Sequence, residues 1–291
     1  MIPAPFDYHR AGSLDEAIGL LVRYGADAKV LAGGMSLLPA LKLRIGSCAH
    51  LVDIGRIPGL EYIREEGGFL RIGAGTRQAT LERNELVNSR YPILADAVPL
   101  IADPLVRNRG TIGGNLANGD PANDHPAIAI ALGAQLVARS PRGERTIAAN
   151  RFYKSLFETE LKADELLTEI RVPVPAPASG GAYRKLKRKT GDYAAVAVAV
   201  QLTLGKGRAV ERAGIALTNA GPTPLEALDA QAYLTSKVVD QKTIDETARR
   251  VAGVASPSAD RRGSVEYKRE MARVLAGRAL RAAVERAGGQ P

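Results

Sequence analysis

The feature that most constrains this fold is a strand signature in the second half of the chain. Five bulky residues (Val196, Val198, Val200, Leu202, Leu204) alternate with five smaller ones (Ala195, Ala197, Ala199, Gln201, Thr203). Side chains of a β-strand point alternately to opposite faces, so the strand has a bulky face and a small face. A turn at 205–208, an apolar segment at 213–218 and alanine-rich amphipathic stretches at 224–234, 243–254 and 264–287 follow. We expect an antiparallel sheet with a helical layer.

The first half alternates helical and strand patterns. Ser13 and Glu16 form a capping box before a helical apolar pattern. Segment 103–126 is dense in Gly, Asn, Asp and Pro, which predicts a long structured loop, and 165–172 is interpreted as an edge strand. Alternating prolines at 173–177 favour an extended connector. We therefore predict an α+β chain with two domains, residues 1–176 and 177–291.

Charge and cysteine content exclude several classes of protein. Forty Lys and Arg face 31 Asp and Glu, a formal charge of +9, yet aromatic residues are 4% and Trp is absent. A basic cluster at 184–189 leads into an apolar strand, so a solvated or partner-facing edge is favoured over a nucleic-acid site. The single cysteine, Cys48, cannot form an intrachain disulfide or bind an iron–sulfur cluster, and the three histidines have no metal-binding spacing. Electron transfer would need an organic cofactor.

The N-terminus lacks the apolar core of a signal peptide, and no apolar run approaches the roughly 18 residues that span a bilayer. We expect a cytoplasmic protein without a transmembrane segment.

Two glycine pairs are each followed closely by a polar side chain. They lie in Ala32-Gly33-Gly34-Met35-Ser36 and Thr111-Ile112-Gly113-Gly114-Asn115. Adjacent glycines let the backbone approach a ligand and turn N–H groups toward one point, which suits a pyrophosphate. Each pair could also be a simple turn. A third candidate, Gly73-Ala-Gly75, lacks the last glycine of the dinucleotide fingerprint and is interpreted as a strand end turning into a helix.

Amide and carboxylate side chains gather after the second glycine pair. They are Asn115, Asn118, Asp120, Asn123 and Asp124. Such groups can hydrogen-bond a polyhydroxyl chain such as ribityl. Calcium binding is a rival interpretation, although the EF-hand order is absent, and a capped structural loop is another.

These segments carry a family resemblance. AGGxSLLP (32–39), TIGGN (111–115) and ANGDPxND (from 117) resemble the FAD-binding medium subunits of the molybdenum hydroxylase family. The resemblance covers nearly the whole chain, including KLKRKTGDY (185–193), LTN (217–219) and SADRRG (258–263). ANGDPxND and KLKRKxGDYA are more similar to the carbon monoxide dehydrogenase branch than to the others.

The resemblance implies a fold and a site. The fold is a two-subdomain FAD-binding domain of the vanillyl-alcohol-oxidase type, followed by a C-terminal domain. The two glycine loops would wrap the FAD diphosphate, Asp124 would bind along the ribityl and pyrophosphate, and Lys185 and Tyr193 would reach toward the isoalloxazine. Tyr193 could instead be core packing. The expected cofactor-binding residues are Ala32, Gly33, Gly34, Met35, Ser36, Leu37, Ile101, Ala102, Thr111, Ile112, Gly113, Gly114, Asn115, Asn118, Asp120, Asp124, Lys185 and Tyr193.

Met35 departs from the family pattern, because relatives commonly carry His or Gln there. Only its backbone N–H would remain available to FAD.

The resemblance also implies partners. A large subunit would hold molybdopterin cytosine dinucleotide with molybdenum and copper and oxidise CO with water to CO2. A small subunit with two [2Fe–2S] clusters would pass electrons to FAD in this chain, and FAD to a quinone or other acceptor. We expect a dimer of heterotrimers, peripheral at the inner membrane face, with no catalytic or metal-binding residue here. The alternative is the medium subunit of another hydroxylase, acting on an N-heterocycle, aldehyde or aromatic thioester.

Overall fold

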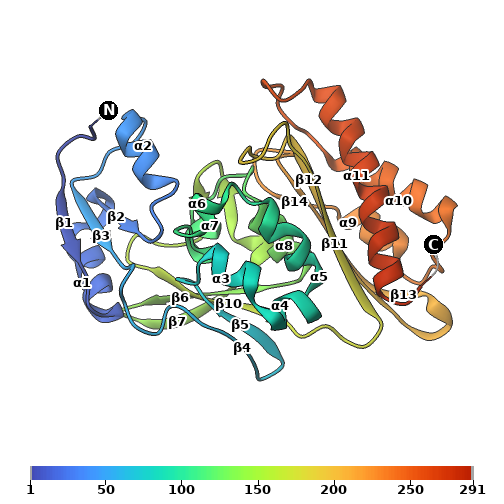
Figure 1. Cartoon of the computed structure of the whole chain (residues 1–291), viewed down its shortest axis with the longest axis horizontal. Helices are drawn as coiled ribbons and strands as arrows, with labels where there is room; N and C mark the ends of the chain where they lie inside the picture. Colours follow the sequence, from blue (N-terminus) through green and yellow to red (C-terminus); the bar gives the residue numbers. More distant parts are fainter. Residues whose placement is uncertain (1, 290–291) are drawn as a thin grey trace.

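The computed structural model describes residues 2–289. Three units follow one another along the long axis of the molecule (Figure 1). We call them the N-terminal unit (7–53), the middle unit (63–173) and the C-terminal unit (179–286). No helix among the described residues is long and apolar enough to cross a membrane.

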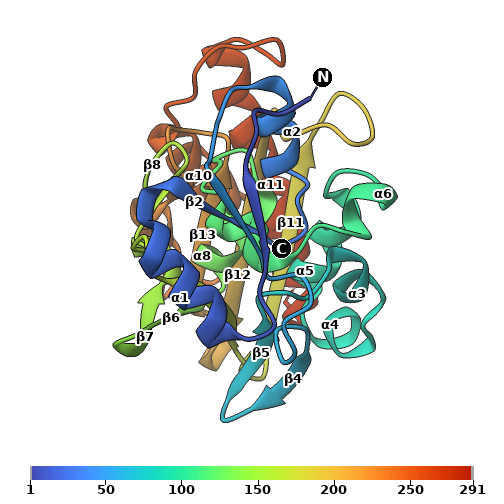
Figure 2. The same cartoon turned by 90° about the vertical axis from the view of Figure 1, so that its left-hand side faces the viewer.

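The N-terminal unit is a three-stranded parallel sheet with strand order β1-β3-β2. Its elements are β1 (Asp7–Arg10), α1 (Leu14–Tyr24), η1 (Gly25–Asp27), β2 (Ala28–Leu31), α2 (Leu37–Leu43) and β3 (His50–Asp53). Ser13 caps α1 as predicted, because its hydroxyl accepts the N–H of Glu16 at 3.1 Å. Figure 2, in which this unit faces the viewer, shows α1 beside the small sheet. The carboxyl end of β2 leads directly into the first glycine loop.

The middle unit has a five-stranded antiparallel sheet of order β4-β5-β10-β6-β7. Its strands are β4 (Ile63–Glu66), β5 (Phe69–Gly73), β6 (Gln135–Ser140), β7 (Gly143–Ala148) and β10 (Leu166–Pro173), beside a small hairpin of β8 (Tyr153–Ser155) and β9 (Glu158–Thr159). Its helices outside 103–126 are α3 (Gln78–Arg83), α4 (Glu85–Arg90), α5 (Pro92–Ala97), η2 (Val98–Leu100) and η3 (Ala149–Arg151). The prediction that 165–172 is an edge strand is wrong, because β10 pairs with β5 on one side and β6 on the other. Its buried Glu169 is compatible with this position because Arg71 pairs with it at 2.7 Å.

The prediction of one long loop over 103–126 is also wrong. The segment contains α6 (Pro104–Arg107), α7 (Ile112–Ala117) and the start of α8 (Asp124–Ala131). Its polar residues start these helices: Asp103 accepts the N–H of Val106 at 2.9 Å, and Thr111 that of Gly114 at 3.1 Å. The residue types that are common in loops are also common at helix N-caps, so composition alone could not reveal these short helices.

The C-terminal unit is a four-stranded antiparallel sheet, β11-β12-β13-β14, under a helical layer, as predicted. Its elements are β11 (Ser179–Leu186), β12 (Val196–Leu204), η4 (Lys206–Arg208), β13 (Val210–Thr218), β14 (Leu225–Glu226), α9 (Leu228–Leu234), α10 (Gln241–Val254) and α11 (Val265–Arg286). The bulky face of β12 packs in one core with residues of α10 and α11. The small face packs in the core of the middle unit.

The small face of β12 is therefore largely buried between the two units. It is covered by α8 and α5 of the middle unit, and a Cβ at Gly214 of β13 would lie 2.0 Å from the carbonyl oxygen of Ala131. Small residues allow a helix to pack closely against this sheet. Tyr193, ahead of β12, is 41% exposed, and Gln201 and Thr203 on the small face are partly buried.

Asp96 of α5 also joins the middle and C-terminal units. Its carboxylate accepts hydrogen bonds from Arg184 of β11 at 2.7 Å and from both Nη atoms of Arg286 of α11 at 2.8 Å. The Tyr183 N–H donates to it at 3.1 Å. Although burial opposes the charge, these partners lower the pKa of Asp96 overall.

Asp96→Asn is expected to lower the free energy of unfolding by about 2 kcal/mol at pH 6, because two arginines lose their carboxylate. A carboxylate whose folded pKa is lowered stabilises the fold fully above its unfolded pKa, near 3.9, and loses this contribution as pH falls through the folded pKa. The difference between wild type and variant should therefore be constant from pH 5 to 7 and shrink below pH 4. Urea unfolding at several pH values measures it; a difference independent of pH down to 3 would contradict this account.

Candidate functional site

The two predicted glycine loops lie side by side. The first connects β2 to α2, and a Cβ at Gly33 would lie 2.3 Å from the carbonyl oxygen of Arg109. Only glycine permits this approach to the segment that enters the second loop. A Cβ at Gly114 would lie 3.7 Å from that of Ala32. The fold thus joins two motifs almost eighty positions apart in sequence.

The loops differ in their backbone N–H groups. In the second loop, Ile112 and Gly113 donate to the carbonyls of Thr76 and Ala74, and Asn115 donates to that of Thr111, at 2.9 to 3.0 Å. The Gly114 N–H is taken by the Thr111 hydroxyl. By contrast, no acceptor within residues 2–289 bonds the N–H groups of 33–37. The first loop therefore offers a run of free donors to an anion, whereas in the second loop only the Thr111 N–H has no acceptor among the described residues.

The amide side chain of Asn115 points to an additional ligand contact. Its Oδ1 is buried and has no hydrogen-bond partner among the described residues. The backbone carbonyl of Asn115 accepts a hydrogen bond from the side-chain amide of Asn123 at 2.8 Å, and this bond holds the following loop against α7. A buried acceptor without a partner is unfavourable, so a donor on a ligand would satisfy it.

Asp120 and Asn118 lie on the turn that follows α7. Asp120 accepts the N–H of Ala122 at 2.9 Å, and burial raises its pKa. Asn118 is half-buried at the end of α7. The hairpin between β8 and β9 closes over this turn, because the Gly119 carbonyl accepts the N–H of Phe157 at 3.0 Å.

Asp124 and Lys185 form a buried ion pair between the units. The Lys185 Nζ lies 2.8 Å from Asp124, and the two side chains are 1% and 5% exposed. Tyr183 donates to the other carboxylate oxygen at 2.5 Å, and Lys185 also donates to the Leu100 carbonyl at 3.1 Å. Burial raises the pKa of Asp124 although Lys185 opposes the rise. The pair links α8 to β11.

Lys185 also lies near two further predicted site residues. Leu100, whose carbonyl accepts the bond from Lys185, is followed by Ile101, which is buried, and by Ala102, whose φ of 45° is unusual for a residue other than glycine. Such a conformation persists only where surrounding contacts hold it, and it is common at ligand sites.

Tyr193 stands where the units meet. It is 41% exposed, so it is not simple core packing, and burial of its hydroxyl with the nearby charge of Asp120 raises its pKa, while the nearby Ser36 side chain of the first glycine loop opposes the rise. The Arg262 guanidinium lies 5.9 Å from the centre of the Tyr193 ring. The first glycine loop and the C-terminal unit therefore approach each other at Tyr193.

Sequence reasoning missed Arg262. It belongs to the SADRRG segment that contributed to the resemblance, but no chemical role was visible there. Only the folded chain brings it next to Tyr193, because the two residues are 69 positions apart.

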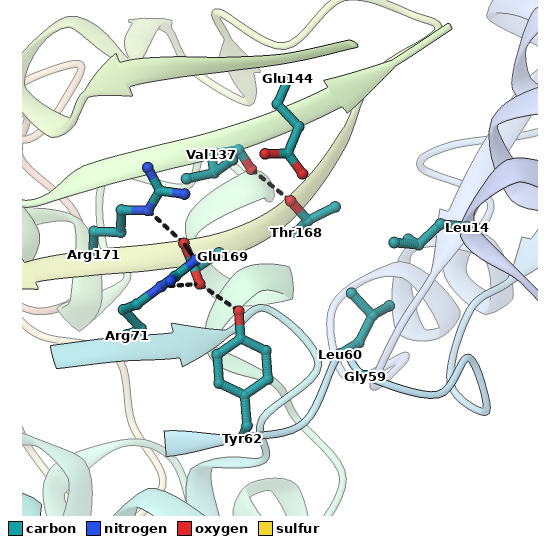
Figure 3. Close-up of a pocket in the computed structure, with 10 residues that line it drawn as sticks. All are labelled: Leu14, Gly59, Leu60, Tyr62, Arg71, Val137, Glu144, Thr168, Glu169 and Arg171. Carbon is teal, nitrogen blue, oxygen red and sulfur yellow. Dashed lines mark hydrogen bonds and ion pairs between the residues drawn. The ribbon is translucent and has the colours of Figure 1, made fainter. Parts of the chain in front are cut away.

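A separate cavity of about 160 Å³ lies between the N-terminal and middle units (Figure 3). Glu169 accepts bonds there from Tyr62 at 2.5 Å, Arg71 at 2.7 Å and Arg171 at 2.5 Å, opposite an apolar wall of Leu14 and Leu60. All these polar partners are paired with one another. The cavity lacks the free donors and the unpaired amide of the glycine-loop site, so its side chains do not indicate a ligand site.

Comparison with known proteins identifies the family. The family described as the FAD binding domain in molybdopterin dehydrogenase matches residues 4–175. The chain belongs to this family. Residues 181–283 match a second family, the CO dehydrogenase flavoprotein C-terminal domain. The predicted family and fold class are confirmed, and the chain carries an FAD-binding domain.

Individual relatives agree along almost the full length. The chain is 46% identical over 283 residues to the carbon monoxide dehydrogenase medium chain of Hydrogenophaga pseudoflava, covering 97% of this chain and 98% of that one. It is also 46% identical to the medium chain of Afipia carboxidovorans, covering 99% and 98%. A solved carbon monoxide dehydrogenase from H. pseudoflava superimposes with a TM-score of 0.95 over 98% of this chain and 99% of that one, at 48% identity. Quinoline 2-oxidoreductase from Pseudomonas putida 86 is more distant, with a TM-score of 0.91 and 32% identity, covering 99% of both.

Proposed function

We propose that this chain is the FAD-binding, electron-transfer subunit of an aerobic carbon monoxide dehydrogenase, which oxidises CO with water to CO2. The observation that carries the proposal is the set of free N–H groups at 33–37 beside the buried, unpaired Oδ1 of Asn115, in a family whose domain binds FAD. Similarity to two carbon monoxide dehydrogenase medium chains favours this branch.

The residues fit FAD. Five consecutive free N–H groups suit a diphosphate, and the unpaired Asn115 acceptor suits a hydroxyl or amino donor. In this proposal Ala32 to Leu37 supply the diphosphate donors. The second loop, in which the N–H groups of 112–115 are already bonded, forms the wall against which the diphosphate lies. Met35, a residue that is 37% exposed, contributes its N–H alone.

The other proposed residues surround this centre. Asn118, Asp120 and Asp124 line the ribityl and pyrophosphate side, while Ile101 and Ala102 lie beside Lys185. Asp124 and Lys185 act from buried positions, where each fixes the other across the units. Tyr193 faces the isoalloxazine with its exposed side. Bound FAD supplies the electron-transfer chemistry; the chain binds and orients it, and no residue here acts on CO.

The proposed assembly follows from this role. Electrons would come from two [2Fe–2S] clusters in a small subunit, and CO would be oxidised at molybdopterin cytosine dinucleotide with molybdenum and copper in a large subunit, within a dimer of heterotrimers. FAD would pass electrons to a quinone or another acceptor, which favours a cytoplasmic complex at the inner membrane face. We also propose the domain division at residue 176, since β10 ends at Pro173 and β11 begins at Ser179.

Co-purification through this chain followed by substrate-dependent dye reduction tests the function. The proposal predicts two further subunits, and reduction of an artificial electron acceptor on addition of CO. Reduction with an N-heterocycle, aldehyde or aromatic thioester instead of CO would assign the chain to the alternative hydroxylases. The same preparation without added substrate is the control.

A further inference from the structure

Arg262 occupies a tight turn between α10 and α11. Asp260 and Gly263 exchange backbone hydrogen bonds at 3.1 and 3.2 Å across this turn. The Asp260 carboxylate accepts the Arg262 N–H at 2.7 Å and is itself paired with the buried Lys268 at 3.0 Å. The backbone of Arg262 is therefore fixed.

The side chain of Arg262 is also held in place. Its Nη2 donates to Asp192 at 3.0 Å, and Asp192 pairs with Arg188 at 3.0 Å as well. Asp192 accepts the Tyr193 N–H at 3.1 Å, so the same carboxylate positions both the guanidinium and the tyrosine. This pairing explains why the guanidinium lies next to the Tyr193 ring.

One donor of this fixed guanidinium remains unused. The Nε of Arg262 is buried and has no partner among the described residues. Arginine cannot lose its proton, so this N–H stays charged and unsatisfied until an acceptor arrives. The ion-paired cluster has three cations (Arg188, Arg262, Lys268) and two carboxylates (Asp192, Asp260), and the Asp120 carboxylate lies within electrostatic range of Arg262 as well.

Arg262 also acts on groups across the site. Its charge lowers the pKa of Asp120 in the middle unit and that of Tyr193, although burial raises both overall. Arg262 therefore lies within electrostatic range of the Asp120 turn and of Tyr193. The proposed function places the flavin ring beside Tyr193.

We propose that Arg262 binds the edge of the flavin ring that becomes negatively charged on reduction, and thereby favours the reduced form of FAD over the oxidised form. This inference rests on the proposed function. A fixed cation with a free donor stabilises developing negative charge without reorganisation. The diphosphate is the other anion within the cofactor, but it has its own donors at 33–37.

The test compares three variants of the full chain in its complex. Arg262→Gln removes the charge, Asp192→Asn removes a neighbouring negative charge while its oxygen still accepts a bond, and Arg261→Gln removes an exposed charge one residue away as the control. FAD midpoint potential is measured by spectroelectrochemical titration, and the affinity of the apoprotein for oxidised FAD by fluorescence. Circular dichroism monitors folding.

The two site variants are expected to shift the potential in opposite directions. Arg262→Gln should weaken the binding of reduced FAD about tenfold relative to that of oxidised FAD. This change corresponds to a decrease in the midpoint potential of roughly 30 mV for a two-electron couple. Asp192→Asn should raise the potential, and Arg261→Gln should match wild type. Structural damage alone would not produce opposite signs. If Arg262→Gln fails to fold, Asp192→Asn decides by itself.

Several outcomes would overturn the inference. An unchanged potential in Arg262→Gln, or a decrease in Asp192→Asn, would do so. If Arg262→Gln weakened the binding of oxidised and reduced FAD equally, Arg262 would be assigned to the diphosphate, and the inference would also be overturned. A wild-type chain that takes up no FAD would overturn the proposed function and this inference together, whereas the other outcomes leave the proposed function intact.

Discussion

Gly114→Val is expected to reduce bound FAD to less than a tenth of the wild-type content while the chain still folds. A Cβ at Gly114 would lie 2.8 Å from the Thr111 hydroxyl and 3.7 Å from the Ala32 Cβ, so valine pushes into the junction of the two glycine loops. Displacing the Thr111 hydroxyl also removes the cap of α7, at a cost of about 1 kcal/mol. Flavin absorbance per chain measures the effect.

Gly46→Val is the matched control, because a Cβ there meets nothing within 4 Å. It should retain full FAD content. Gly33→Val is a poorer test, since its Cβ would meet the backbone of Arg109 and disturb the fold itself. Wild-type flavin content in a folded Gly114→Val chain would remove these loops from the site.

Lys185→Met is expected to lower the free energy of unfolding by about 3–5 kcal/mol, because it leaves Asp124 buried without its cation. Burial raises the pKa of Asp124 already, and loss of Lys185 raises it further. An acid with a raised folded pKa binds extra protons in the fold, so stability falls as pH rises. The loss should therefore be larger at pH 8 than at pH 5, as urea unfolding can show.

The double variant Lys185→Met/Asp124→Asn should recover part of this loss, since it removes the unpaired charge. Lys189→Met, at an exposed position near the same strand, is the control and should change stability by less than about 0.5 kcal/mol. A Lys185→Met chain as stable as this control would show that the pair does not hold the units together.

Patterns local in sequence predicted much of the fold. The helix start at Ser13, the alternation in β12 and the alanine-rich helices were confirmed because each depends on neighbouring residues, although Glu16 bonds the N–H of Gly12 and not that of Ser13. The interior position of β10 was missed, because strand order depends on partners nearly a hundred positions apart. The short helices of 103–126 were missed because capping residues and loop residues are the same types.

The candidate site divides in the same way. Both glycine loops are visible in the sequence, but which of them has free N–H groups depends on acceptors such as Thr76 and Ala74 in the folded chain. The pairing of Asp124 with Lys185 and the position of Arg262 beside Tyr193 join segments of the middle and C-terminal units. No local pattern predicts such contacts.

The flavin content of the purified wild-type chain, in its complex or after incubation with FAD, tests the central claim most directly. The account predicts a flavin absorption spectrum corresponding to one FAD per chain, retained through gel filtration. A folded chain that is colourless and takes up no flavin would contradict it.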